Sequence, residues 1–247
     1  MFFETLQSIS RKQLPRKPDG TAAPQFQSPN QSPNMSYSTM LKRKSPGSGP
    51  SVTTQKMPGL NVIRSMLTMA DGSMLTTCDN NKITMTRSDF GQSSTVMAGA
   101  SSVFEGNTDG DGNRASFGCP MVVAMDLVGN VVVVDKRNNV LRFIYKLSGV
   151  VRTFAGNGRA GYMNGMAQNA EFNSPTNVVA MKDGHFVVSD TNNHCLRVVA
   201  ENGTVGTLCH RDERGCEVGN KDEARFNSPR GLVVTRDGDL LVMYCIA

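Results

Sequence analysis

The chain of 247 residues has no tryptophan, few other aromatic residues and only three histidines. It contains no run of about 20 apolar residues, which a membrane-spanning helix requires, so we expect no membrane partner. Glu4 follows directly on Met1-Phe2-Phe3, which excludes the apolar core of a secretory signal. None of the six cysteines belongs to a C-x-x-C pair, and we expect them to be reduced thiols. These absences favour an intracellular protein of the cytoplasm or nucleus.

The positive charge is scarce where a nucleic-acid-binding fold would need it. The formal net charge is +5, but residues 1–56 hold eight Lys/Arg and two Asp/Glu. The remaining residues hold eighteen basic and nineteen acidic side chains, a net charge of −1. The basic character therefore belongs to the N-terminal segment. This distribution opposes a nucleic-acid-binding fold, whose basic footprint lies on the domain itself.

Residues 1–56 are rich in Ser, Pro, Gln and Asn, and we expect a disordered basic tail. Phe2, Phe3, Leu6 and Ile9 could line one face of a short helix, which would serve as a transit peptide or a docking segment. An unstructured start is favoured, because isolated helices of this length are marginal in water. Three Ser-Pro pairs and the basic run 42–44 are candidate phosphorylation and nuclear-import signals.

A repeat organises the rest of the chain. Phe117, Phe172 and Phe226 are 55 and 54 residues apart, and each is followed three residues later by a proline. These prolines are Pro120, Pro175 and Pro229. A period near 50 is typical of arrays of supersecondary units. The units span approximately 58–99, 103–156, 158–208 and 215–247, and the last stops about halfway.

Each unit predicts four short strands, because Val-rich runs alternate with turn residues. In the third unit we expect strands over 176–181, 185–189, 195–200 and 204–208. Asp183-Gly184 and Asn202-Gly203 predict two-residue turns in which both residues have positive φ. Asp190, like Asp135 one unit earlier, is expected to hold the turn between the second and third strands by bonding the backbone two residues on.

A four-stranded antiparallel unit that recurs every 54–55 residues is a propeller blade. A blade cannot cover both of its own faces, so blades must stack. We therefore expect an all-β propeller in which Phe172 packs between neighbouring blades, and its burial contributes about 1.5–3 kcal/mol.

The same residues resemble the NHL repeat. The pattern is a proline and an apolar run, an Asp-Gly turn, and D-x-x-N-x-x-[apolar]-R, as in Pro175, Asp183-Gly184, Asp190, Asn193 and Leu196-Arg197. A long inter-blade loop of the form Gly, Gly, Ala, Phe matches at Gly161 and at the corresponding residues of two other units. The resemblance covers about residues 57–247. It implies a six-bladed class of propeller, of which about three and a half blades are present.

The match departs from the family pattern in two ways. Tyr244 and Cys78 stand where the blade Asp is expected. The resemblance also implies a closed ring, which three and a half blades do not provide. The expected explanations are a truncated product, a fragment, or half of a ring completed by another chain, and truncation is favoured.

The turn between the second and third strands and the loop between blades should emerge on the same face, because strands alternate in direction. Propellers present binding residues on such loops. Turn chemistry explains the Asp and Asn residues that recur in every unit, so residues that differ between units are the better candidates. The predicted partner-binding rim comprises Arg137, Asn138, Arg159, Tyr162, Asn193, His194, Arg211 and Arg214.

The sequence offers no convincing metal or catalytic set. Asn107 begins a calcium-like loop, but the twelfth position is Gly118 instead of Glu. The histidines at 185, 194 and 210 fall at unlike positions in the blade, and no cysteine spacing is typical of zinc. A Ser-His-Asp arrangement is missing as well. We expect no cofactor, no metal and no small-molecule substrate.

The leading functional hypothesis is a non-enzymatic scaffold that binds a protein partner through its loop face. The resemblance implies this role, because relatives join such propellers to ubiquitin-ligase, kinase or BTB-type domains. RNA binding through a basic rim is the first alternative. A lactonase- or lyase-like enzyme is the second, and the missing metal set opposes it.

Overall fold

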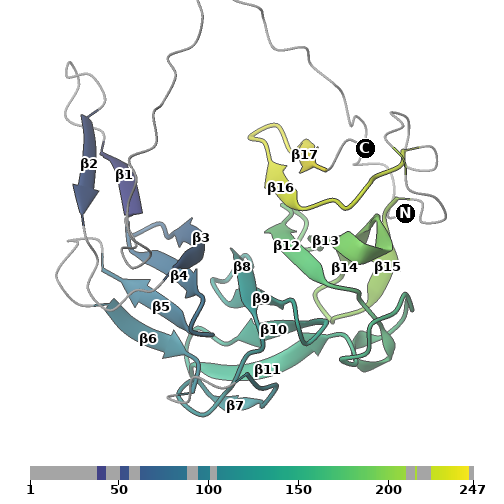
Figure 1. The fold of residues 1–247 in the computed structure, drawn as a ribbon, viewed down its shortest axis with the longest axis horizontal. Coiled ribbons are helices and arrows are strands. Elements are labelled where there is room, and N and C mark those ends of the chain that lie inside the picture. The colour runs from purple at the N-terminus through teal and green to yellow at the C-terminus, as the bar shows by residue number, and fades with distance from the viewer. Residues whose placement is uncertain are drawn as a thin grey trace, which may run out of the picture.

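The computed structural model describes residues 38–42, 51–55, 62–87, 94–100, 105–209, 215 and 224–244. Outside one short 3-10 helix in a loop and another in a turn, its regular elements are strands. Four antiparallel sheets follow one another around an open arc (Figure 1). The protein is thus an all-β propeller with an incomplete ring, which confirms the predicted fold class.

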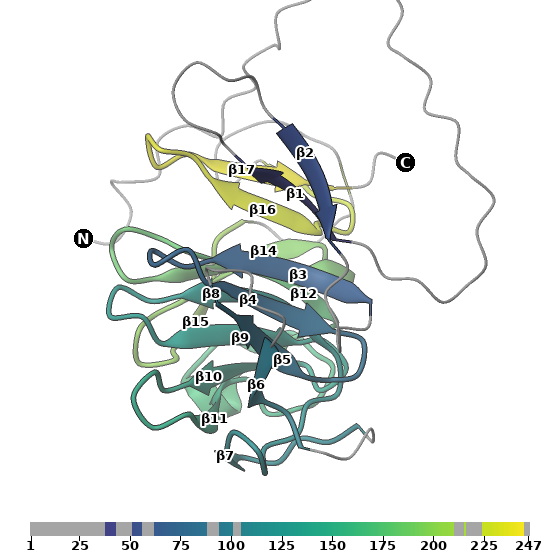
Figure 2. The same cartoon turned by 90° about the vertical axis from the view of Figure 1, so that its left-hand side faces the viewer.

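The first two blades have the predicted four strands. Blade 1 consists of β3 (Ile63–Thr68), β4 (Met74–Cys78), β5 (Ile83–Thr86) and β6 (Ser94–Ala98), seen from the side in Figure 2. Blade 2 consists of β8 (Pro120–Met125), β9 (Val131–Asp135), β10 (Val140–Ile144) and β11 (Val150–Ala155). The loop before blade 2 adds β7 (Gly110–Asp111) to the outer edge of β11.

Blade 3 consists of β12 (Pro175–Ala180), β13 (Phe186–Asp190), β14 (Cys195–Val199) and β15 (Val205–Thr207), each within one residue of its predicted ends. The short helices η1 (Ala167–Asn169) and η2 (Thr191–Asn193) lie in the preceding loop and in the turn after β13. Blade 4 is described by β16 (Gly231–Val234) and β17 (Leu240–Met243).

The predicted tail of residues 1–56 lies largely outside the described residues. The exceptions are β1 (Ser38–Lys42) and β2 (Ser51–Gln55), which pair as an antiparallel hairpin. The prediction had no strand here, because the segment lacks the Val-rich runs of the blades. β-branched Val52, Thr53 and Thr54 are the local residues that favour an extended backbone.

The turn type predicted for the blades was wrong. At the turn after β12, the Gly184 N–H donates to the Met181 carbonyl, while the Met181 N–H donates to the His185 carbonyl. Gly184 alone adopts positive φ, at 86°. The turn is therefore a three-residue loop, a tight turn followed by a left-handed glycine. The corresponding glycines of the other blades, Gly72, Gly129 and Gly238, have φ between 80° and 95°.

Each recurring phenylalanine is buried between two sheets. Phe172 packs in one cluster with Val134 and Leu141 of blade 2 and with Val178 and Val188 of blade 3. Phe117 and Phe226 occupy the same place at the junctions of blades 1 and 2 and of blades 3 and 4. The inner strands also touch, since β8 contacts β3 on one side and β12 on the other. The core therefore lies between blades and runs along the arc.

Candidate functional site

A buried carboxylate anchors the start of blade 3. The Oδ1 atom of Asp190 accepts a hydrogen bond of 2.7 Å from the backbone N–H of Asn173. Its Oδ2 atom accepts hydrogen bonds from the Asn193 amide at 2.8 Å and from the Arg197 guanidinium at 2.9 Å. The first of these bonds spans 17 residues. The predicted bond from Asp190 to the backbone two residues on is therefore wrong, because the carboxylate instead joins the turn, through the Asn193 side chain, to the end of the inter-blade loop.

Arg197 completes this connection from the middle of β14, where it is fully buried. Its guanidinium donates to the carbonyls of Glu171 and Met163 and to the Asn164 side chain, at 2.7–3.0 Å. It also lies over the Tyr162 ring, 4.6 Å from the centroid. The Asn193 amide adds a hydrogen bond to the Gly161 carbonyl at 2.7 Å. The loop of residues 156–174 is thus bound to the blade through buried, charge-assisted hydrogen bonds.

Blade 2 repeats the arrangement with one difference. Asp135 accepts from the backbone N–H groups of Gly118 and Cys119, and the Asn138 amide bridges it to the Gly106 carbonyl. Arg142, however, lies 3.7 Å from Asp135 and makes a closer ion pair of 2.8 Å with Asp109. In blade 3 the residue that corresponds to Asp109 is Asn164, which accepts a hydrogen bond from Arg197.

The repeat pattern contains Arg197, and Arg142 at the same position one unit earlier, but the sequence gave neither arginine a structural role. The available signal was an arginine in the centre of an otherwise apolar strand, since Arg142 interrupts Val-Leu-Arg-Phe-Ile. A buried arginine needs several acceptors, and those acceptors come from a loop 26–35 residues away.

The carboxyls of Asp135 and Asp190 are both buried and hydrogen-bonded within the protein. Burial raises the pKa of Asp190 and of Asp135 above the ordinary value, while backbone N–H groups, asparagine amides and the arginines act in the opposite direction. Backbone N–H groups at the ends of the inter-blade loops and asparagine amides in the turns donate to these carboxyls. This arrangement fixes loops on a rigid scaffold.

His194 links blade 3 to blade 4. Its Nδ1 atom accepts a hydrogen bond of 3.0 Å from the backbone N–H of Ser228. Asn139 is its counterpart in blade 2 and accepts from the Ser174 N–H at 2.9 Å. Both residues have left-handed backbone, with φ of 54° and 52°. The histidine, which looked unique in sequence, therefore performs a task that recurs between blades.

We expect His194→Ala to destabilise the junction of blades 3 and 4 by about 1–3 kcal/mol, because a backbone donor loses its acceptor. His194→Asn should stay close to wild type, because Asn139 performs the same task and asparagine tolerates positive φ. His194→Gly relieves the backbone without restoring the acceptor and separates the two effects. Urea midpoints measure all three variants. Equal midpoints for the Ala and Asn variants would show that the hydrogen bond contributes nothing.

The predicted rim residues divide into two groups. Asn138, Asn193 and His194 are engaged in the contacts above, and the half-buried Tyr162 packs on Arg197. Arg159 is exposed, and Arg137 is exposed but paired with Glu105. Arg211 and Arg214 lie outside the described residues. Binding by this rim stays a prediction.

Charge is distributed unevenly between the two faces of the arc. We call loop face the edge that holds the turns between second and third strands, the starts of the first strands and the inter-blade loops next to them. Its described side chains that reach solvent include seven bases, namely Arg64, Lys82, Lys136, Arg137, Arg159, Arg225 and Arg230, against four acids, Asp79, Glu105, Asp109 and Glu171.

The opposite edge, the hairpin face, holds the turns between first and second and between third and fourth strands. There acids and bases are nearly balanced: Asp71, Asp126, Asp183, Glu201, Asp237 and Asp239 stand against Arg87, Lys146, Arg152, Lys182 and Arg236. The near-neutral charge of the repeats thus conceals an excess of bases on the described part of the loop face.

The described part of the chain lacks two further features. No three His, Cys, Asp or Glu side chains come together there in a way that could hold a metal ion. Within the same residues, no helix has the length and apolar character needed to cross a membrane.

The NHL repeat family matches residues 172–199, from the interblade Phe172 to the end of β14. Blade 3 is an NHL repeat. The match confirms the resemblance found in the sequence, and blades 1 and 2 have the same order of four strands. The family match itself is confined to blade 3.

Known proteins share the fold with this chain. The Protein SUPPRESSOR OF QUENCHING 1, chloroplastic, of Arabidopsis thaliana is 28% identical over 94 residues, which are 38% of this chain and 9% of that protein. A protein of unknown function from Bacteroides thetaiotaomicron has a TM-score of 0.58 at 20% identity, over 74% of this chain and 44% of its own. A gluconolactonase from Xanthomonas campestris has a TM-score of 0.52 at 13% identity, over 75% and 55%.

The chain thus spans about half the length of these solved structures and less than a tenth of the plant protein. At such identities the structures share the propeller architecture. A propeller of this type supports a binding or scaffold role.

Proposed function

We propose that the chain is a non-enzymatic scaffold that binds an acidic segment of a protein partner on its loop face. The excess of basic side chains on that face carries the proposal. Arg64, Arg159 and Arg230 are exposed there. Arg159 belongs to the loop that Asp190 and Arg197 fix to blade 3, so binding there costs little ordering of the backbone.

A protein partner fits this face better than RNA does. Proteins that bind single-stranded RNA stack bases on exposed aromatic side chains. On the described loop face, Phe117, Phe172 and Phe226 are buried, and the Tyr162 ring is stacked against Arg197. The face therefore offers charge without a stacking platform, which suits carboxylates of a protein segment.

Arg64→Glu/Arg159→Glu tests the proposal against a control of equal charge, Arg87→Glu/Arg236→Glu on the hairpin face. Each immobilised protein is exposed to extract of the cells that express it, and captured proteins are identified by mass spectrometry. We expect the loop-face variant to capture at least tenfold less of those proteins that wild type and the control both capture. Capture should resist ribonuclease.

Two outcomes would reject the proposal. Capture abolished by ribonuclease assigns the basic face to RNA. Equal capture by both variants shows that the loop face is not the binding surface. Folding of each variant is checked by its urea midpoint, which should match wild type because all four arginines are exposed.

A further inference from the structure

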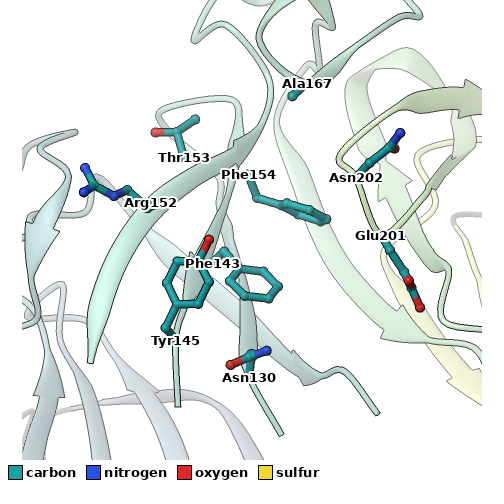
Figure 3. A pocket seen from close by; sticks show the side chains of 9 residues that line it. All are labelled: Asn130, Phe143, Tyr145, Arg152, Thr153, Phe154, Ala167, Glu201 and Asn202. Atoms are coloured by element: carbon teal, nitrogen blue, oxygen red, sulfur yellow. The ribbon is translucent and has the colours of Figure 1, made fainter. Parts of the chain in front are cut away.

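A pocket of about 430 Å³ lies between blades 2 and 3, toward the hairpin face (Figure 3). One wall is the outer half of blade 2, where Phe143 lies on β10, Tyr145 directly follows it and Phe154 lies on β11. The other wall is the turn after β14, with Glu201 and Asn202. The pocket therefore belongs to two blades, and a single repeat unit does not form it.

Three aromatic rings cover the wall on blade 2. The Phe143 ring centroid lies 5.0 Å from that of Tyr145 and 5.3 Å from that of Phe154. Phe143 and Phe154 are half-buried, and Tyr145 is 45% exposed. Aromatic side chains that line a cavity bind the apolar part of a ligand. The rings pack against each other, so they form one continuous surface for a large apolar side chain.

The repeat does not require aromatic residues at these three positions. Strand pairing identifies the corresponding residues of the other blades, which are Met85, Arg87 and Met97 in blade 1 and Val198, Ala200 and Leu208 in blade 3. Among the three blades whose outer strands are described, blade 2 alone has aromatic rings there. Grouped apolar side chains that reach solvent without being needed by the fold are typical of interaction sites.

Two side chains of opposite charge flank the rings. Arg152 is exposed on the wall of blade 2, where it pairs across the strands with Phe143. Glu201 is exposed on the wall of blade 3. Figure 3 shows the two charged side chains on opposite sides of the aromatic rings. Within the described part of the chain, neither has an ion-pair partner. A ligand therefore meets a base on one side, an acid on the other and an apolar surface between them.

The other charged residues of these turns do not alter that balance. The Lys146 side chain lies beside Gly129, away from the pocket wall. The Asp126 carboxylate accepts three hydrogen bonds within its own turn and does not line the pocket either. The charges that face a ligand are thus one positive and one negative, on opposite walls.

We propose that the pocket binds an extended segment of a partner protein in which a large apolar residue lies between an acidic and a basic residue. The apolar side chain packs on the aromatic rings, the acid pairs with Arg152 and the base pairs with Glu201. Alternate residues of an extended chain face the same side. The recognised order is therefore acid-x-apolar-x-base, or its reverse.

The separation of the two charges selects this kind of ligand. A segment with charge of one sign would bring a like charge to one of the two walls, which opposes binding. A free amino acid carries both charges on one carbon atom, whereas the pocket holds its acid and base on either side of the rings. The site is on the face opposite to the loop face, so it is independent of the proposed function. A chain with both sites holds two partners at once.

Selection from a library of random peptides displayed on phage, with the full-length chain immobilised, tests the proposal. We expect wild type to enrich peptides with a large apolar residue between an acid and a base. Synthetic copies of these peptides should bind Tyr145→Ala at least tenfold more weakly, as measured by fluorescence polarisation. Blade 3 has Ala200 at this position, so the alanine is compatible with the blade.

Charge reversal is the second variant. Arg152→Glu/Glu201→Arg keeps the net charge and exchanges the two walls, so it should enrich peptides with acid and base in the opposite order. The loop-face variant Arg64→Glu/Arg159→Glu should bind the wild-type peptides unchanged, which separates this site from the proposed function. Urea midpoints should match wild type, because the substituted side chains are exposed.

Three outcomes would overturn the proposal. In the first, wild type enriches no group of peptides that Tyr145→Ala fails to bind. In the second, the charge-reversed variant selects the same order of acid and base as wild type. In the third, the peptides are lost with the loop-face variant and kept with both pocket variants.

Discussion

Asp190→Asn is expected to lower the free energy of unfolding by about 3–5 kcal/mol, because it leaves a buried arginine without its ion-pair partner. Three donors converge on this carboxylate, with Asn173 on Oδ1 and Asn193 and Arg197 on Oδ2. An asparagine offers a single acceptor oxygen. Its amide NH₂ would face a donor, whichever way the side chain is turned. Urea unfolding followed by circular dichroism measures the loss.

Two other aspartates provide matched controls. Asp135→Asn should cost less, because Arg142 keeps its ion pair of 2.8 Å with Asp109. Asp183→Asn on the exposed turn should cost under about 1 kcal/mol, since surface changes have small effects. If the three variants lost equal stability, the ion pair of Asp190 and Arg197 would contribute no more than an exposed aspartate does.

Phe172→Ala should destabilise the protein by about 3–5 kcal/mol, the usual range for a buried phenylalanine. Its ring is fully buried between blades 2 and 3 and contacts residues of both. The Arg197 guanidinium lies over the same ring at 5.3 Å, so the substitution also removes packing from the buried ion pair. The thermal or urea midpoint reports the loss.

Asn192→Ala is the control for this substitution, because Asn192 is exposed and its side chain makes one hydrogen bond of 3.4 Å to Asn173. We expect its midpoint to stay near that of wild type. Phe172→Leu should be intermediate, since it keeps part of the buried volume. Similar small losses for the alanine variants would mean that Phe172 does not hold the blades together.

The fold could be predicted from sequence because its signals are local and repeated. Val-rich strands, a glycine in each tight turn and the spacing of Phe117, Phe172 and Phe226 place the strands of blade 3 within one residue. Repetition also separates scaffold from candidate site. A residue that recurs at the same turn in each unit is explained by the turn itself and need not belong to a binding site.

Long-range partners could not be predicted in the same way. The sequence shows Asp190 beside a turn, but not the Asn173 N–H that reaches it from 17 residues away. It presents His194 as unique, although the backbone gives it the task of Asn139.

The placement of the core between blades determines how the molecule comes apart. Among the described elements, the inner strand β12 touches the inner strands of blades 2 and 4, as β8 touches those of blades 1 and 3. Each blade is then stabilised mainly by its contacts with the neighbouring blades. Whether the blades unfold together depends on the weakest of these interfaces. A cavity at Phe172 would weaken the interface between blades 2 and 3 and so separate blades 1 and 2 from blades 3 and 4. Native-state hydrogen exchange would show β3 to β11 and β12 to β17 opening as separate units, where the wild type opens as one.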